Sequence, residues 1–416
     1  MKTKKTSNYI LNLLGIGTAI ALLGDGTLYT VLPHPDISAQ LGITLSMVGL
    51  LLGANRAIRL IVNGPVGVLY DRLPRRGLLI AALSFGAVSS IFYAIGNGFW
   101  PLLVGRIMWG LAWSLLWVGG NTVVLDVSDE ENRGQNSGRY QMWFFIGVAS
   151  SSFLGALLTD MFGFRVGQWI SVVVIAATAL VWLFFLPETR PDDVKAKELI
   201  DEKDKLTRMK LPWKVIAATS LTIFVARFLA WGVLAATAIL WLSDLFGDGM
   251  RIPSLFIPIA TLTGLFTALS NLTSVGSTRL AGSISDRLGR RWTVIGLSMI
   301  LGGLGLWLMS GEIRGLALIG GFLVPIAGSS SETMIPAIAG DRVPKQLRSR
   351  ALGLINTAGD LGAMIGPFAA LGVLNSGLLP LSGIYQVGGV LFGVVALLAF
   401  SPFAARRLRM DDEDRK

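Results

Sequence analysis

The chain has 416 residues, of which 52% are hydrophobic and 15% charged, with no cysteine and a single histidine, His34. A soluble domain carries about a quarter charged residues, so this composition excludes an ordinary water-soluble protein. The lack of cysteine excludes disulfides and thiolate metal sites, and one histidine in a loop argues against a transition-metal centre. The net charge of +10 would suit nucleic-acid binding, so the distribution of the basic residues has to decide that question.

Twelve apolar segments follow one another, each of about 20 residues, the length a helix needs to cross the hydrocarbon core. The first six lie near residues 9–32, 44–67, 77–97, 100–124, 138–160 and 166–186, and the second six near 213–242, 254–280, 292–310, 315–339, 350–375 and 382–403. The first segment is too long for the apolar region of a signal peptide and has no small-residue cleavage site, so we expect it to be a membrane helix.

The only long polar stretch runs from Pro187 to Lys214. We therefore expect an all-α membrane protein with 12 transmembrane helices in two six-helix bundles. The predicted domains are an N-terminal bundle at 1–186, a cytoplasmic linker at 187–212 and a C-terminal bundle at 213–416.

Basic residues gather in every second loop, whereas the alternate loops hold only Arg165, Arg251 and Arg314. By the positive-inside rule this pattern places both termini and the central linker in the cytoplasm of a multi-pass protein of the cell membrane. Basic residues scattered over many short loops form no groove, so the pattern also argues against nucleic-acid binding.

One short loop occurs twice, as GVLYDRLPRR from Gly67 and GSISDRLGRR from Gly282, and its aspartates are 215 positions apart (286 − 71). The same offset relates Asp126 to Asp341, so we infer that one half of the chain copies the other. We expect the glycines to let helix ends approach, the aspartates to accept hydrogen bonds or pair with arginine, and the arginines to anchor the loop at a negatively charged leaflet. The loop residues of interest are Gly67, Asp71, Arg72, Arg76, Gly282, Asp286, Arg287 and Arg291.

The twelve segments and the doubled loop resemble the major facilitator superfamily, whose loop pattern is Gly-x-x-x-Asp-Arg-x-Gly-Arg-Arg/Lys. The second copy fits this pattern, and the first has Pro74 in place of the glycine. The resemblance implies two pseudo-symmetric six-helix bundles that rock around a central site to give alternating access. It also implies that Asp71 steadies the outward-open state, with Asp286 as its weaker counterpart.

Three further stretches are similar to motifs of this family. The stretch from Gly105 to Gly110 resembles a motif whose buried arginine, here Arg106, is linked to proton coupling. Asp25, followed by Thr30-Val31-Leu32-Pro33, is similar to the first helix of twelve-helix drug/proton antiporters. The antiporter signature that the family carries in its fifth helix matches only weakly at that place in this chain. A closer match lies in the eleventh helix, at Gly362, Gly366 and Pro367. This displacement leaves the direction of transport open.

Ionisable side chains within the apolar segments cost a few kcal/mol or more at bilayer depth, so we expect them to face the interior and to act in coupling or binding. They are Asp25, Arg56, Arg59, Arg106, Arg227, Glu332 and Asp360. A carboxylate in a dry cavity takes up a proton readily, and an approaching arginine favours its release. The leading hypothesis is a coupling pair of Asp25 with Arg106 or Arg56. The alternatives are that such pairs are structural, or that Arg56 and Arg59 clamp Asp25 or a helix end.

In the fourth helix, Arg106 and three tryptophans recur every three or four residues and share one face. Because a buried arginine marks that face as interior, we expect it to line the substrate cavity, although inter-helix packing explains the stripe equally well. The predicted lining comprises Trp109, Trp113, Trp117, Asn121, Gln141, Trp231, Asn271 and Asn356.

The favoured function is a secondary transporter working by alternating access, with proton-coupled export of amphipathic small molecules. One alternative is a carrier of organic anions, phosphorylated solutes or lipids, by uptake or exchange; another is a non-transporting receptor or assembly protein. An enzyme is not expected, since there is no phosphate loop, metal-ligand cluster or nucleophile–histidine pair and hence no catalytic residue, metal or cofactor. The expected partners are a small-molecule substrate, H⁺ and membrane lipids, with the protein a monomer.

Overall fold

A computed structural model describes residues 4–128, 133–190, 212–253, 255–288, 290–344 and 347–401, and nearly all of them are helical. Twelve helical segments within these residues are long and apolar enough to cross a membrane. The expectation of an all-α, multi-pass membrane protein with twelve spans is therefore confirmed.

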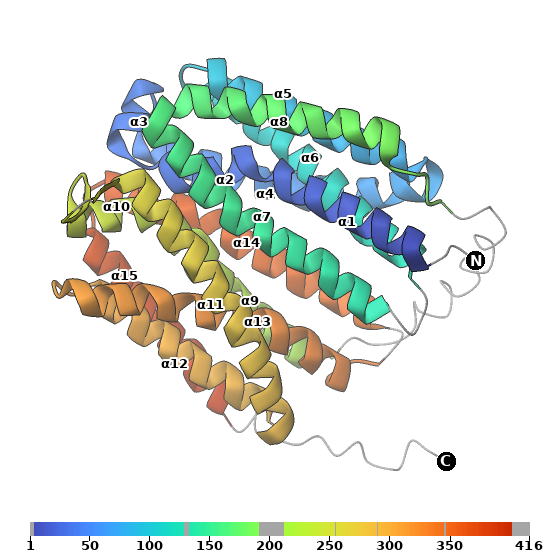
Figure 1. Cartoon of the computed structure of the whole chain (residues 1–416). Coiled ribbons are helices and arrows are strands. Elements are labelled where there is room, and N and C mark those ends of the chain that lie inside the picture. The colour runs from blue at the N-terminus through green and yellow to red at the C-terminus, as the bar shows by residue number, and fades with distance from the viewer. Residues whose placement is uncertain are drawn as a thin grey trace, which may run out of the picture. The chain divides into compact units, whose positions relative to one another are not determined.

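The first six spans are formed by seven helices, with one short helix between the first two spans. The helices are α1 (Lys4–Ala21), α2 (Leu23–Val31), α3 (Pro35–Gln40), α4 (Leu45–Arg72), α5 (Arg75–Ile95), α6 (Phe99–Asp126), α7 (Arg133–Phe162) and α8 (Phe164–Phe185). The first span consists of α1 and α2, which are separated by Leu22 in the chain (Figure 1). His34 lies in the loop, as expected, and its Nδ1 accepts from the Asp36 N–H at the start of α3.

The second six spans include a turn of π-helix and a small hairpin. The elements are α9 (Trp213–Arg227), η3 (Phe228–Leu234), α10 (Ala235–Phe246), β1 (Gly249–Ile252), β2 (Leu255–Pro258), α11 (Ile259–Leu288), α12 (Arg291–Met309), α13 (Arg314–Arg342), α14 (Arg348–Asn375) and α15 (Leu381–Phe400). The strands are antiparallel, with Gly249 opposite Pro258 and Ile252 opposite Leu255. The eighth span, predicted to begin near 254, therefore begins at Ile259, because the residues before it pair as a strand.

Glycines make the tight turns that separate neighbouring spans. Gly98 and Gly163 precede α6 and α8 with φ of 76° and 84°, a conformation that side chains with a Cβ rarely adopt. Both glycines lie between apolar segments of the sequence, at the points where one span ends and the next begins.

The chain divides into two compact units. The first comprises the described parts of Met1–Lys210, Arg227–Leu272 and Gly359–Pro380. In it α5 packs against α6 and α8, α4 packs against α6, and α1 and α2 pack against α7. Its core includes the fully buried side chains of Trp182, Tyr70 and Tyr140.

The second unit comprises the described parts of Leu211–Ala226, Thr273–Ala358 and Leu381–Lys416. Within it α12 packs against both α13 and α15. Most of the predicted linker lies outside the described residues, and the division into 1–186, 187–212 and 213–416 stays a prediction.

Candidate substrate and coupling site

A buried ion pair joins α2 to α6 in the first unit. The Nη1 atom of Arg106 donates to Oδ1 of Asp25, and the two side chains are 1% and 14% exposed. Of the two partners that the sequence offered for Asp25, Arg106 makes the contact, and a coupling role for this pair stays a prediction. Removing either partner would leave a buried charge uncompensated, which costs far more than the loss of a surface ion pair.

The other donors of Arg106 reach the backbone of α4. Its Nε donates to the carbonyl oxygen of Leu51 at 2.9 Å, and Nη2 lies 3.5 Å from that of Leu52. The Leu52 carbonyl also accepts from the hydroxyl of Tyr29 at 2.7 Å, and the Arg106 guanidinium lies over the Tyr29 ring at 5.4 Å. The guanidinium is thus fixed among α2, α4 and α6.

Glycines bring these helices close enough for the pair to form. A Cβ at Gly110 would lie 2.9 Å from the carbonyl oxygen of Asn55 on α4, and one at Gly105 would lie 2.5 Å from Cε1 of Tyr93 on α5. A Cβ at Gly24, the neighbour of Asp25 in the chain, would likewise lie 2.5 Å from Oγ of Ser90 on α5. Any side chain at these positions would push the helices apart, which gives the glycines of the Gly105–Gly110 motif a packing role.

A second ionic cluster lies in the same unit and joins α9, α4 and α14. Nη1 of Arg227 donates to Oδ1 of Asp360 at 2.9 Å, and Nη2 of Arg59 lies 3.8 Å from Oδ2 of the same carboxylate. The Arg227 guanidinium also lies over the Trp231 ring, 5.3 Å from its centroid. Three residues predicted separately as in-membrane charges therefore meet at one place.

Small residues also determine this arrangement. Cβ atoms at Gly49 and Gly53 of α4 would lie 2.8 and 2.5 Å from backbone oxygens of Pro367 and Met364 on α14. The glycines and the charges occupy successive turns of α4, so close packing of the helices brings Arg59 level with Asp360 on α14.

The π-helical turn η3 begins directly after Arg227 and supports the same crossing. Gly232 of this turn faces Gly366 of α14, and a Cβ at either would lie within 2.7 Å of the Cα of the other. The glycine motif of the eleventh span thus serves a close contact with η3. π-Turns are rare and often occur at functional sites.

Arg56 adds a third guanidinium beside this cluster. No carboxylate in the described ranges lies within ion-pair distance of it, and its Nε is buried without a hydrogen-bond partner there, as is Nε of Arg59. The suggestion that Arg56 and Arg59 clamp Asp25 is wrong, because Asp25 pairs with Arg106 and Arg59 faces Asp360. Three guanidiniums thus lie in or beside this cluster.

The tryptophan stripe of α6 faces protein. Trp109 and Trp113, 3% and 7% exposed, belong to the core of the first unit, and Trp117 packs against its edge. Trp113 stacks on Trp117 at 5.4 Å between ring centroids, and both contact Phe144 of α7. The interior placement is as expected, whereas lining of a substrate cavity stays a prediction.

The remaining predicted residues are Asn121, Asn271, Gln141, Glu332 and Asn356. Asn121 and Asn271 donate to carbonyl oxygens one turn back in their own helices, and Gln141 is half-buried on α7. Glu332, half-buried on α13, and Asn356, exposed on α14, belong to the second unit. Their roles at a central site stay predictions.

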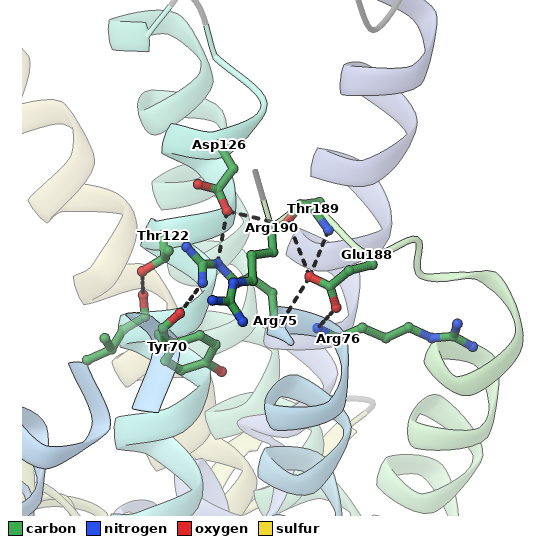
Figure 2. Close-up of polar contacts among 9 residues, drawn as sticks. Tyr70, Arg75, Arg76, Thr122, Asp126, Glu188, Thr189 and Arg190 are labelled. Carbon is green, nitrogen blue, oxygen red and sulfur yellow. Dashed lines mark hydrogen bonds and ion pairs between the residues drawn. The ribbon is translucent and has the colours of Figure 1, made fainter. Parts of the chain in front are cut away.

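The last two residues of the first copy of the doubled loop, Arg75 and Arg76, take part in a polar network in the first unit (Figure 2). Nε of Arg75 lies 3.2 Å from Oδ2 of Asp126, and its Nη1 donates to the Tyr70 carbonyl. Glu188, just after α8, accepts from the backbone N–H groups of Arg75 and Arg76 at 3.0 Å each. A carboxylate from elsewhere in the chain thus caps the N-terminus of α5, where Pro74 offers no side-chain cap.

These contacts lower the pKa of Glu188. Partial burial would by itself raise the pKa of Glu188, but four backbone N–H donors prevail and hold that pKa below its usual 4.5. The donors are those of Arg190, Arg76, Arg75 and Thr189.

The second unit has a corresponding pair, Arg291 with Asp341, in which Nε of Arg291 donates to Oδ2. By the 215-residue offset, Arg291 should correspond to Arg76, yet Arg75 makes the contact in the first unit. The reason is that α5 begins at Arg75 and α12 at Arg291, one residue out of step with the repeat.

Further expectations concern the doubled loop. A Cβ at Gly67 or Gly282 would meet no described atom within 4 Å, and the expected close approach of helix ends at these glycines stays a prediction. Arg72 and Arg287 are exposed, as expected of loop arginines. The side chains of Asp71 and Asp286 lie outside the described residues, so their pairing stays a prediction.

Sequence reasoning missed three residues whose side chains make contacts between helices. Glu188 falls in the predicted linker, and Tyr29 carries no signal because a tyrosine in an apolar segment is ordinary. Asp160, near the end of α7, accepts from the backbone N–H of Thr261 at 2.6 Å and from its hydroxyl at 2.5 Å, capping α11. The only signal for this cap in the sequence is a charged residue at the end of one apolar segment, together with the start of another helix elsewhere in the chain.

Twelve spans and buried ion pairs between helices define a polytopic membrane transporter. The sequence model of the Major Facilitator Superfamily matches residues 14–280 and 260–416, so the chain belongs to this family. It is a secondary transporter and not an enzyme.

An uncharacterised MFS-type transporter of Methanocaldococcus jannaschii is 23% identical over 92% of this chain and 96% of its own length. The class C tetracycline resistance protein of Escherichia coli is 22% identical over 95% of this chain and 97% of its own. Among solved structures, a bacterial homologue of the human lysosomal transporter Spinster, inward-facing and occupied, matches with a TM-score of 0.74 and 15% identity, covering 97% of this chain and 98% of that one. At this identity the likeness shows the fold alone.

Proposed function

We propose that this transporter exports amphipathic small molecules in exchange for protons, with Asp25 and Arg106 as the coupling pair. The observation that carries the proposal is the buried pair between α2 and α6. Its acid is partly accessible, whereas its arginine is almost fully enclosed and held by backbone carbonyls. A proton can therefore reach the acid without the arginine moving first.

Protonation of Asp25 would remove its charge and leave Arg106 bonded to the α4 carbonyls. The link between α2 and α6 would weaken, and α2, a helical segment separate from α1, could shift. Deprotonation would restore the link. Alternation between these two states is a physical means of tying proton movement to a conformational change.

Other parts of the proposal rest on the sequence and the family. We place both termini in the cytoplasm, treat the protein as a monomer of the cell membrane, and assign alternating access to the two six-span halves, with Asp71 steadying one state. The tetracycline resistance relative supports, at 22% identity, export of an amphipathic compound.

The test is flux in proteoliposomes with an imposed pH gradient, using tetracycline as the probe and pyranine to report internal pH. We expect gradient-driven flux to disappear in Asp25→Asn, while binding of the same probe to purified protein persists. Asp244→Asn, which removes an exposed carboxylate on α10, is the matched control and should transport normally. Gradient-driven flux in Asp25→Asn equal to that of the unmodified protein would remove Asp25 from the coupling role.

A second candidate function is transport of an organic anion by uptake or exchange. The buried Nε donors of Arg56 and Arg59, which have no described acceptor, favour it. This observation concerns the substrate's charge and is compatible with proton coupling through Asp25.

A further inference from the structure

The arginine cluster, defined as Arg56, Arg59 and Arg227 with Asp360, brings several guanidiniums together inside the spans. The side chains of Arg227, Arg59 and Asp360 are 9%, 16% and 14% exposed. Nε of Arg56 and Nε of Arg59 are buried without an acceptor among the described residues, and unsatisfied cationic donors at bilayer depth are costly. Such an arrangement is expected to recruit an anion.

The donors of the cluster are unevenly used. Arg227 is committed to Asp360 by a hydrogen bond of 2.9 Å, whereas Arg59 stands 3.8 Å away, beyond hydrogen-bonding distance. Nε of Arg59 and Nε of Arg56 are buried and donate to no described acceptor. A guanidinium carries five N–H donors, and buried donors without a partner are rare in finished structures. Arg56 and Arg59, one turn apart on α4, therefore present a pair of guanidiniums ready for an oxyanion.

An aromatic surface adjoins the cluster. Trp231 lies in η3, one turn beyond Arg227, and its ring faces the Arg227 guanidinium. The ring is half-buried, so part of it remains available. A cationic pair next to an indole suits a ligand with a negative head group and a flat apolar body.

We propose that the arginine cluster binds the carboxylate or phosphate of an amphipathic organic anion, which is the transported substrate. The assignment rests on the proposed transport function and names its substrate class. Arg56 and Arg59 hold the oxyanion, Trp231 packs on the apolar body, and Asp360 competes with the substrate for Arg59. In the empty site Asp360 is the internal counter-ion; in the loaded site it keeps Arg227 alone.

The test is calorimetric binding to purified protein in neutral detergent at constant pH, with no gradient. The probes are 1-naphthoate, 1-naphthyl phosphate and the neutral 1-naphthamide. We expect both anions to bind, and the amide to bind about tenfold or more weakly, as the loss of a charge-assisted hydrogen bond implies. Equal affinity for the amide and the carboxylate would overturn the proposal.

The variants separate binding from structure. Arg59→Gln should weaken naphthoate binding by about tenfold or more, and Arg59→Lys should restore part of it. Asp360→Asn should tighten binding by about fivefold or more, because it removes the competitor, and a merely structural role for the cluster predicts no such gain. Arg279→Gln, an exposed arginine of α11, is the matched control for loss of charge. Unchanged affinity in both Arg59→Gln and Asp360→Asn would refute the site even if every variant folds.

The two proposals fail in distinguishable ways. If naphthoate binds through Arg59 yet no pH gradient drives its flux, the anion site stands and proton-coupled export falls. If tetracycline moves with the gradient while no naphthyl anion binds, export stands and the anion site falls.

Discussion

The coupling pair permits a quantitative test of buried electrostatics. Arg106 is 1% exposed, and Asp25 is the one described carboxylate that pairs with it, so Asp25→Asn or Arg106→Gln alone should destabilise the protein by about 3–5 kcal/mol. Arg106→Gln also withdraws donors from the carbonyls of Leu51 and Leu52, which places it at the upper end of that range. The double variant leaves no unpaired charge from this pair, so its cost should fall below the sum of the single costs by about 2 kcal/mol.

The assay is unfolding in mixed micelles by increasing sodium dodecyl sulfate, followed by tryptophan fluorescence, for the parent, both single variants and the double variant. Arg279→Gln should change the free energy of unfolding by no more than about 0.5 kcal/mol, as expected of an exposed site. Additive costs of the two single variants, within about 0.5 kcal/mol, would show that Asp25 and Arg106 are not energetically coupled and would refute the reasoning.

Three further predictions concern caps and close contacts. Because the folded-state pKa of Glu188 is lowered, its carboxylate stabilises the fold above pH 4.5 and loses this effect as pH falls through the folded-state value; Glu188→Gln should flatten the loss of thermal stability measured below pH 4.5. Gly366→Leu should disrupt the crossing of η3 and α14 and lower the melting temperature more than Gly372→Leu, since a Cβ at Gly372 meets no described atom. Asp160→Ala should remove the cap of α11 and cost about 1 kcal/mol, whereas Asp160→Asn should retain most of it, both measured by micellar unfolding.

Each of these has a contrary outcome. A pH profile of Glu188→Gln parallel to that of the parent would mean that the α5 cap contributes nothing at low pH. Equal melting temperatures for the two leucine variants would deny the close packing of η3 on α14. Equal losses for Asp160→Ala and Asp160→Asn would assign the effect to charge and not to the hydrogen bonds with Thr261.

The sequence by itself determined the class of protein, the twelve spans and the internal duplication. These follow from local properties of the chain. A run of about 20 apolar residues satisfies its backbone hydrogen bonds in a membrane by forming a spanning helix, and glycines mark the turns between such runs. The in-membrane charges were identifiable one by one for the same reason, since each is costly wherever its helix packs.

The partners of those charges were decided by the tertiary structure. Arg106 and Asp25 are 81 residues apart, and Arg227 and Asp360 are 133 apart. Helical periodicity gives the face of each residue but not the rotation and depth of one helix against another, which depend on contacts such as Gly110 on Asn55 and Gly232 on Gly366. The repeat aligns Arg76 with Arg291 and Asp126 with Asp341, yet Arg75 contacts Asp126, because the start of each helix sets which arginine faces the aspartate.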